Sequence, residues 1–454
     1  MSSASLAKDL TTGRPFRQLV VFSIPFVISN LLQQAYNLAD MAIVGRFIGT
    51  AGLSAASAGG EIAMFYLFLS LGFGSAGQII IAQNVGIGNH RGISRTIGTL
   101  FTLQFIVSAL LTVISILICD PFLRLINVPD EAFAMAHEYS IVLFAGMIPV
   151  FGYNTIGSIL RGMGDSKHPM MFIMLSASLN VALDLLFVGP MDMGCFGAAL
   201  ATALSQTVAF IVSIVFLYRN RVAFGFDFKL QSFKMDPTIL RSIFSLGLPL
   251  TLQNAAITIS MLYVNSYINA MGVVAAAATA VGNKVTLLAT ICTQALATAG
   301  SSIVAQNFAA GKHDRMTKTI VYILVLGLAY CGIMAVLLLL FPEAIFGIFD
   351  KNPEVLALAG VYAPIGALNF IGFASRSPAM AFINGIGFSR LSFVTCFVDG
   401  IVARIGLSLL FGVYMGMGIS GFWLGSTLAG YVFLFVGIVY FAMGTWKKRK
   451  PIVS

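Results

Sequence analysis

Seven ionisable side chains interrupt the long apolar stretches of this sequence and give the first indication of chemistry. They are Asp40, Glu61, Asp184, Lys284, Arg376, Asp399 and Arg404. A lone charge at the centre of a lipid bilayer costs at least about 2.5 kcal/mol, so such residues usually face a cavity or a partner and mark the path of an ion or a substrate. If the apolar stretches span a membrane, these seven residues are the leading candidates for function.

Polar residues share one face of the first apolar stretch. Five of them recur at helical spacings of three, four and seven: Asn30, Gln33, Gln34, Asn37 and Asp40. In a later stretch, Asn180 and Asp184 are four residues apart and therefore also share a face. We expect both faces to point into the interior of a helical bundle.

Depth along the helices groups the first candidates further. Counted from the nearest predicted outer end, Asp40 lies six residues deep, Asp184 about five and Thr202 about eight, which is roughly 7–12 Å at 1.5 Å per residue. With Asn180, they place carboxylate, amide and hydroxyl oxygens in one layer. That set suits a hard cation, or a proton shared by two carboxylates.

Two interpretations of this layer compete. It could be a polar network that only joins helices, or it could bind the ion that drives a transport cycle. Two carboxylates with no evident cationic neighbour make a poor structural link. The sequence therefore favours a cation-binding or coupling site at Asp40, Asn180, Asp184 and Thr202.

The remaining charges allow several interpretations. Glu61 and Lys284 are 223 residues apart, and they could form an ion pair between two halves, contact substrate, or pair locally. Arg376, Asp399 and Arg404 could neutralise one another, so a structural ion cluster is favoured there over a second coupling site.

The composition identifies the elements that carry these residues. Hydrophobic residues make up 58% of the 454 residues and charged residues only 9%, whereas soluble proteins carry roughly 25% charged residues. Because a membrane-spanning helix needs about 20 mostly apolar residues, the chain has room for about twelve. The predicted spans are at about 17–45, 53–83, 93–118, 136–160, 167–188, 194–218, 239–268, 273–306, 316–341, 355–383, 389–413 and 417–445.

The basic residues predict the orientation of these spans. If the N-terminus is cytoplasmic, 20 of the 26 Lys and Arg residues fall on that side, three on the other and three inside spans. This bias places both termini in the cytoplasm, and we expect a multi-pass protein of the plasma membrane. It also explains the net charge of +9 without a nucleic-acid partner.

The second half of the chain repeats the first at an offset close to 223 residues. Ala82-Gln83-Asn84 matches Ala305-Gln306-Asn307, and Pro25 matches Pro249 within one residue. We expect an all-α membrane protein with two pseudo-symmetric six-helix lobes, at 1–218 and 237–454, joined by a cytoplasmic linker at 219–236.

The sequence resembles the MATE (multidrug and toxic compound extrusion) family, in particular its bacterial DinF-like branch. The resemblance covers essentially the whole chain. It rests on Pro25 and on four segments: Tyr36–Asp40 (YNLAD), Leu160–Ser166 (LRGMGDS), Leu179–Asp184 (LNVALD) and Gly197–Thr202 (GAALAT).

The resemblance implies a V-shaped twelve-helix antiporter that exports cationic or amphipathic compounds in exchange for Na⁺ or H⁺. It also implies a cation site in the N-terminal lobe that maps onto Asp40, Asn180, Asp184 and Thr202, and a first helix that bends at Pro25. Six residues are expected to line the substrate cleft or to support coupling: Pro25, Gln33, Tyr36, Asn37, Glu61 and Lys284. The NorM-like branch uses carboxylates in the seventh and tenth spans, and here those spans contain no Asp or Glu.

Other functions lack their signatures. The chain has no Walker motif, and its two GxGxxG matches do not follow a strand. The scattered cysteines and histidines predict neither a disulfide framework nor a metal site beyond Na⁺ at the coupling site. A flippase for lipid-linked precursors would favour a more cationic cleft, and a membrane-embedded enzyme would need a catalytic set that is not evident. We expect a monomeric transporter with a drug-like substrate, no cofactor, and H⁺ or Na⁺ as coupling ion.

Overall fold

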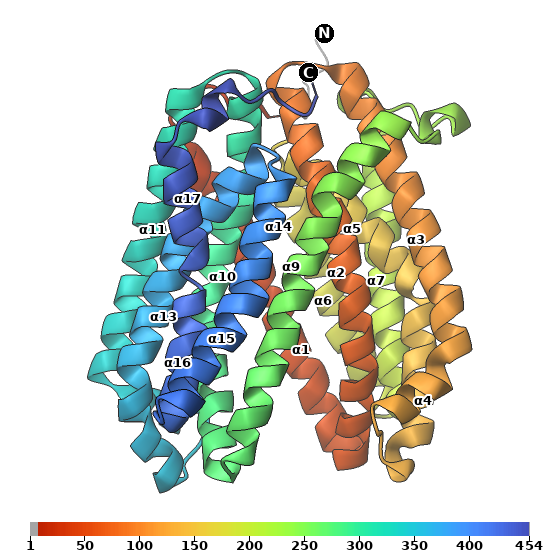
Figure 1. The fold of residues 1–454 in the computed structure, drawn as a ribbon. Helices are drawn as coiled ribbons and strands as arrows, with labels where there is room; N and C mark the ends of the chain where they lie inside the picture. The colour runs from red at the N-terminus through yellow and green to blue at the C-terminus, as the bar shows by residue number, and fades with distance from the viewer. Residues whose placement is uncertain (1–7, 454) are drawn as a thin grey trace. The chain divides into compact units, whose positions relative to one another are not determined.

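The computed structural model describes residues 8–453, which form helices and turns with no strand among them (Figure 1). Eleven of the described helices are long and apolar enough to cross a membrane, and a bent pair makes a twelfth span if its two helices are counted together. The predicted all-α membrane fold is therefore confirmed. Residues 1–7 and 454, at the ends of the two predicted lobes, lie outside the described residues.

The first half of the chain supplies seven long helices and two short ones. They are α1 Pro15–Phe47, α2 Thr50–Gly86, α3 His90–Leu125, α4 Asp130–Ala145, α5 Met147–Gly162, α6 Lys167–Phe187, α7 Gly194–Arg219, α8 Arg221–Phe224 and the 3₁₀ helix η1 Leu230–Phe233. The α2 helix packs against α3, α4 and α5, and α6 packs against α7.

The second half also consists mainly of long helices, but these helices are broken at different positions from those of the first half. Its elements are α9 Pro237–Ala270, α10 Val273–Ala309, α11 His313–Leu340, α12 Pro342–Gly347, α13 Pro353–Gly385, α14 Ser389–Phe397, the π-helix η2 Val398–Ala403, α15 Arg404–Leu409, the π-helix η3 Leu410–Tyr414, α16 Gly418–Ala429, α17 Val432–Ala442 and η4 Thr445–Lys448. The α13 helix packs against both α10 and α11.

The predicted fourth span, 136–160, is two helices rather than one. The α4 and α5 helices meet at Gly146 with a bend of 47°. Pro149 has no N–H to bond the carbonyl of Ala145, which removes one helical hydrogen bond beside the glycine. In the second half, the equivalent α13 continues through Asn369 without a break.

The chain divides into two compact units whose boundaries differ from the predicted lobes. Leu10–Ser23 groups with Pro249–Ser454, whereas Ile24–Leu248 forms most of the other unit. The start of α1 therefore belongs to the second unit, and the linker with the start of α9 belongs to the first. Both boundaries lie within two residues of the repeated prolines, Pro25 and Pro249.

Hydrogen bonds explain why the start of α1 groups with the second unit. The Arg315 guanidinium donates to the carbonyl oxygens of Leu10, Thr12 and Gly13 and to Oε1 of Gln18 at 2.8 Å. Lys312 donates to the carbonyl and hydroxyl oxygens of Thr11, at 2.9 and 2.8 Å. These carbonyl groups precede the first turn of α1, and Lys312 and Arg315 at the start of α11 supply donors to them.

The linker is held on α3 by a similar set of contacts within the first unit. The Thr102 hydroxyl donates to the carbonyl of Phe233 at 2.6 Å, and the backbone N–H of Asp236 donates to Thr99 Oγ1 at 3.1 Å. The carbonyl oxygen of Ser232 lies only 1.8 Å from where a Cβ on Gly98 would be. Glycine at 98 is therefore required for the linker to approach α3 this closely.

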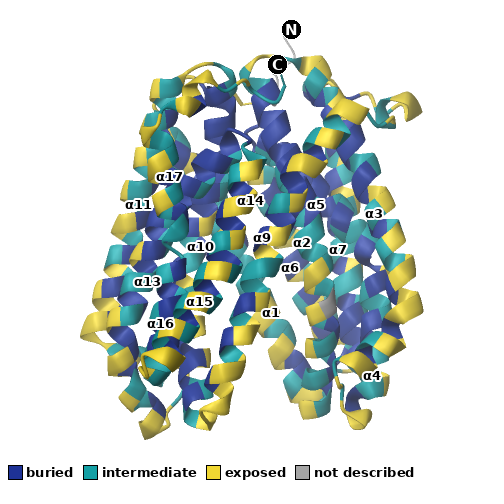
Figure 2. Cartoon of the chain, viewed as in Figure 1, coloured by how far each residue is buried: buried dark blue, intermediate teal, exposed yellow. Residues whose placement is uncertain are grey.

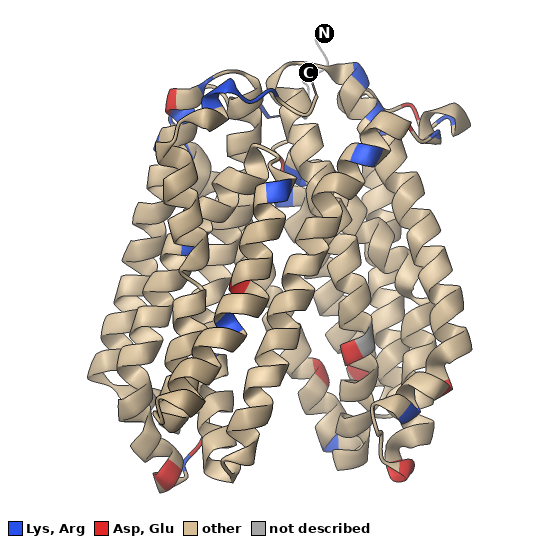
Figure 3. Cartoon of the chain, in the orientation of Figure 1, with Lys and Arg blue, Asp and Glu red and all other residues tan. Residues whose placement is uncertain are grey.

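Burial and charge follow the pattern of a membrane protein. Exposed residues run along the outside of α3 and α11, and most of them are apolar (Figure 2). In the second unit, Lys and Arg gather at the end where the C-terminus lies (Figure 3). Lys447, close to the C-terminus, lines a pocket there together with Lys318.

Candidate ion-coupling site

A hydrogen bond joins two of the predicted site residues across neighbouring helices. Asn180 on α6 donates from Nδ2 to the hydroxyl of Thr202 on α7, at 3.2 Å. Asn180 and Asp184 are 2% and 0% exposed, so their shared face is directed into the first unit. The helical spacing of four residues has placed both on the interior side of α6, as the sequence predicts.

Several oxygen atoms in this region are buried without a hydrogen-bond partner among the described residues. They are Oδ1 of Asp40, Oδ1 of Asn180, and both carboxylate oxygens of Asp184. Buried polar groups in folded proteins are nearly always hydrogen-bonded, because an unsatisfied one costs about 1–3 kcal/mol. A bound cation or proton would satisfy these oxygens.

Electrostatic interaction links the two carboxylates. Asp40 on α1 and Asp184 on α6 both lie in the first unit, close enough for their negative charges to repel each other. Two nearby carboxylates repel each other when both are ionised, and a shared proton or a hard cation relieves that repulsion. Carboxylate, amide and hydroxyl oxygens are also the ligands that hard cations prefer.

Two tyrosines lie in the electrostatic neighbourhood of the same carboxylates. Tyr36 on α1 lies near Asp40, and the buried Tyr139 on α4 lies near both Asp40 and Asp184. Tyr36 is among the residues predicted to support the site, whereas Tyr139 is not. The polar hydroxyl of Tyr139 within an apolar span is the only local signal, and its direction depends on how α4 packs.

The other residues of the α1 stripe surround the site less tightly. Gln33 is half-buried, Asn37 is exposed, and Pro25 lies inside α1. The Ser29 hydroxyl donates to the carbonyl of Pro25 at 2.7 Å. The roles of these residues in substrate binding or coupling stay predictions.

Glu61 on α2 and Lys284 on α10 are both exposed and belong to different units. Lys284 places its ammonium 5.6 Å from the centroid of the Phe349 ring, a distance at which a cation is attracted by the ring. Lys284 therefore has a local partner in the second unit. The ion pair with Glu61 stays a prediction.

The predicted charge cluster in the second unit is brought together around Asp399. Its Oδ1 accepts a hydrogen bond from Arg404 Nη2 at 3.0 Å, and its Oδ2 lies 3.2 Å from Arg376 Nη1 in an ion pair. Arg404 also donates to the carbonyl and hydroxyl oxygens of Ser426, and Arg376 lies over the Phe433 ring, 4.6 Å from its centroid. Pairing and burial together indicate a mainly structural arrangement.

Comparison with known families matches both halves of the chain. Residues 25–186 and 249–410 each match the MatE family. The two matches begin at the repeated prolines and are separated by the linker region, in agreement with the internal repeat.

Individual relatives cover most of the chain. It is 28% identical to the probable multidrug resistance protein YoeA of Bacillus subtilis, over 96% of this chain and 95% of YoeA. It is 24% identical to a FAD transporter of Shewanella oneidensis, over 77% of this chain and 79% of that protein. A solved structure of a MOP superfamily transporter from Pyrococcus furiosus superimposes with a TM-score of 0.89 at 25% identity, covering 97% of this chain and 98% of the other.

Proposed function

Because this chain belongs to the MatE family of membrane transporters, we propose that it is a secondary active antiporter that exports cationic or amphipathic small molecules in exchange for H⁺ or Na⁺. The buried oxygens of Asp40, Asn180 and Asp184 carry this proposal, because they lack partners among the described residues. They would bind the driving ion, with Thr202 supporting Asn180 through its hydroxyl.

Coupling would work through the charge of the carboxylate pair. An ion or proton between Asp40 and Asp184 would remove their mutual repulsion and so change how α1 packs within the first unit. Pro25 interrupts the hydrogen bonding of α1, so the helix can bend there at low cost. Ion binding near one end of α1 would thus change the side of the membrane to which the substrate site is open, which is an alternating-access mechanism.

The proposed setting is the cytoplasmic membrane, with both termini in the cytoplasm and the protein acting as a monomer. The distribution of Lys and Arg supports this orientation. Multidrug substrates are suggested by the name of YoeA, whereas the FAD transporter of Shewanella oneidensis indicates that anionic substrates also belong in any screen.

Transport in proteoliposomes tests the proposal. The purified full-length protein would be reconstituted with a sodium gradient and a proton gradient imposed separately, and a cationic dye and an anionic flavin would be followed in parallel. We expect one gradient to drive export of the cationic dye. Export driven by neither gradient would overturn secondary coupling, and uptake of the flavin alone would overturn the proposed substrate class.

The same assay tests the site. Asp184→Asn keeps the shape of the side chain and removes its charge, so we expect it to abolish gradient-driven export while the protein still inserts and folds. Export at the wild-type rate by this variant would refute the assignment of the coupling site.

A further inference from the structure

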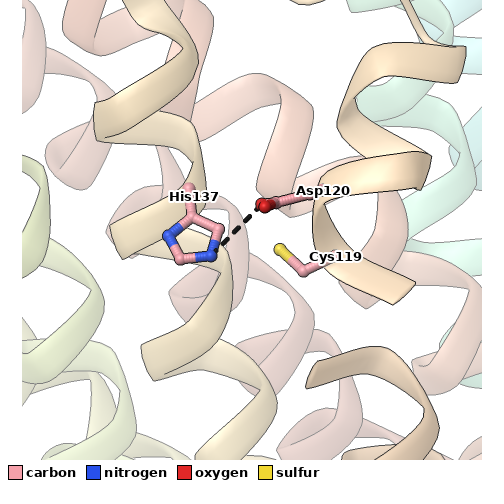
Figure 4. Close-up of side chains that lie close together, drawn as sticks. All are labelled: Cys119, Asp120 and His137. Carbon is pink, nitrogen blue, oxygen red and sulfur yellow. Dashed lines mark ion pairs between the residues drawn. The ribbon is translucent and has the colours of Figure 1, made fainter. Parts of the chain in front are cut away.

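A cysteine, an aspartate and a histidine meet near the end of α3, outside the candidate coupling site (Figure 4). Cys119 and Asp120 are adjacent on α3, and His137 faces them from α4. The thiol sulfur, a carboxylate oxygen and a ring nitrogen all lie within 4.8 Å of one another. Within residues 8–453, no other group of three such side chains has ligand atoms this close together.

The spacing of these atoms is close to what a tetrahedral metal ion requires. Zinc bonds of 2.0–2.3 Å place neighbouring ligand atoms about 3.3–3.8 Å apart. His137 Nε2 and Asp120 Oδ1 are already 3.3 Å apart, and the Cys119 sulfur is at most about 1 Å too far. Metal binding would require the sulfur to move closer to the other two ligand atoms by that amount.

Burial divides the three ligands in a way that suits an accessible metal site. The Cys119 side chain is buried, at 2% exposure, whereas the His137 and Asp120 side chains are 42% and 58% exposed. Metal can therefore enter from solvent, and water can supply a fourth ligand. A thiolate and a carboxylate together balance the charge of a divalent cation.

We propose that Cys119, Asp120 and His137 form a binding site for a borderline-soft divalent cation, of which Zn²⁺ fits best. Sulfur and imidazole ligands favour zinc over the hard cations Mg²⁺ and Ca²⁺, which prefer oxygen. The bound metal would link α3 to α4, because its ligands come from both helices. The site is not evident from the sequence, since Asp120 and His137 are 17 positions apart.

The link also reaches the coupling site. His137 lies two residues before Tyr139 on α4, and Tyr139 belongs to the same buried cluster as Ile43 and Val44, which follow Asp40 by three and four residues on α1. A metal that fixes α4 to α3 would therefore restrict a helix that packs beside the part of α1 that carries Asp40. This consequence rests on the proposed transport function, whereas metal binding itself does not.

Binding is tested with Co²⁺ alone, added to the purified full-length protein under reducing conditions. A thiolate ligand gives a near-ultraviolet sulfur-to-cobalt charge-transfer band, which we expect in the wild type and which Zn²⁺ should displace. Cys119→Ser should lose the band, and His137→Ala should lower the affinity at least about tenfold. The matched controls Cys292→Ser and His90→Ala should keep both the charge-transfer band and the cobalt affinity of the wild type.

Either of two results would overturn the site: a band that persists in Cys119→Ser, or unchanged affinity in His137→Ala. Asp120→Asn tests the site without changing the buried cysteine. The Asp120 side chain is mostly exposed, so the fold should tolerate the change. Unchanged cobalt affinity in this variant would remove Asp120 from the site.

The link to coupling is tested by adding Zn²⁺ to the outside of transporting proteoliposomes. We expect export to slow in the wild type and not in His137→Ala. Zinc inhibition that persists in His137→Ala would overturn the link. If the wild type shows no export even before zinc is added, the proposed function is overturned instead.

Discussion

The side chain of Asn180 donates to the hydroxyl of Thr202 at 3.2 Å and leaves its own carbonyl oxygen free. Thr202 thereby fixes which side of the amide faces the interior of the first unit. The free oxygen is on the same helix face as the carboxylate of Asp184. A single hydroxyl on α7 therefore orients a ligand on α6.

Replacement of Thr202 tests this orienting role. Thr202→Val keeps the shape and removes the hydroxyl, so we expect about tenfold weaker apparent affinity for the driving cation, corresponding to a hydrogen bond of about 1.4 kcal/mol. Thr202→Ser should restore the affinity. The measurement is the cation concentration that gives half-maximal transport. Equal affinities in all three proteins would contradict the role.

The carboxylate pair gives a second prediction. Asp40→Asn removes one of the two charges that repel each other, so coupled export should be lost although the protein remains folded. Asp192→Asn is the matched control, because Asp192 is exposed and its φ of 49° is one that asparagine adopts readily. Transport rates and thermal unfolding are measured for both variants and compared with the wild type. A comparable loss of export in the control would point to a general effect of lost charge.

The clamp on the N-terminal segment predicts a local loss of order. Arg315→Ala removes the donor of four hydrogen bonds to Leu10–Gln18, so we expect at least about 1.5 kcal/mol less stability for that segment. Hydrogen exchange of its backbone amides measures the change. Lys318→Ala, on the exposed side of the same helix, should leave exchange as in the wild type. Slow exchange retained in Arg315→Ala would show that other contacts suffice.

The buried charge cluster predicts an order of stabilities. Asp399→Asn leaves two buried guanidinium groups without their counter-ion and should cost about 3–5 kcal/mol. Arg376→Gln leaves one neutral Asp399–Arg404 pair and should cost less. Thermal unfolding in detergent ranks the two variants. The reverse order would mean that the cluster is stabilised mainly by the contacts of Arg376, including its position over Phe433.

Hydropathy and spacing were sufficient to predict the spans, the repeat and the shared face of Asn180 and Asp184. Those features depend on local sequence, because a span needs a run of apolar residues and a helix face needs a fixed period. The break at Gly146 was missed, since a glycine and a proline three residues apart do not always separate helices. Tyr139 and the Cys119–His137 contact were missed for a different reason: they depend on how α3 and α4 rotate and pack.

The predicted boundaries between lobes show a further limit of sequence reasoning. A linker is recognised by its polar composition, and residues 219–236 fit that description. Composition does not reveal that residues 10–23 find their donors on Lys312 and Arg315. The grouping of the start of α1 with the second unit depends on contacts between residues about 300 positions apart.

The attachment of the N-terminal segment to α10 and α11 also determines when, during synthesis, this segment can form its final contacts. The backbone N–H of Leu10 donates to the side chain of Gln306, 296 residues later in the chain. At about 5–20 residues per second, ribosomes need roughly 15–60 s to synthesise that interval. The start of α1 must therefore wait, without its final partners, while the whole first half is inserted. Proteins that assist membrane insertion have that time to act on it.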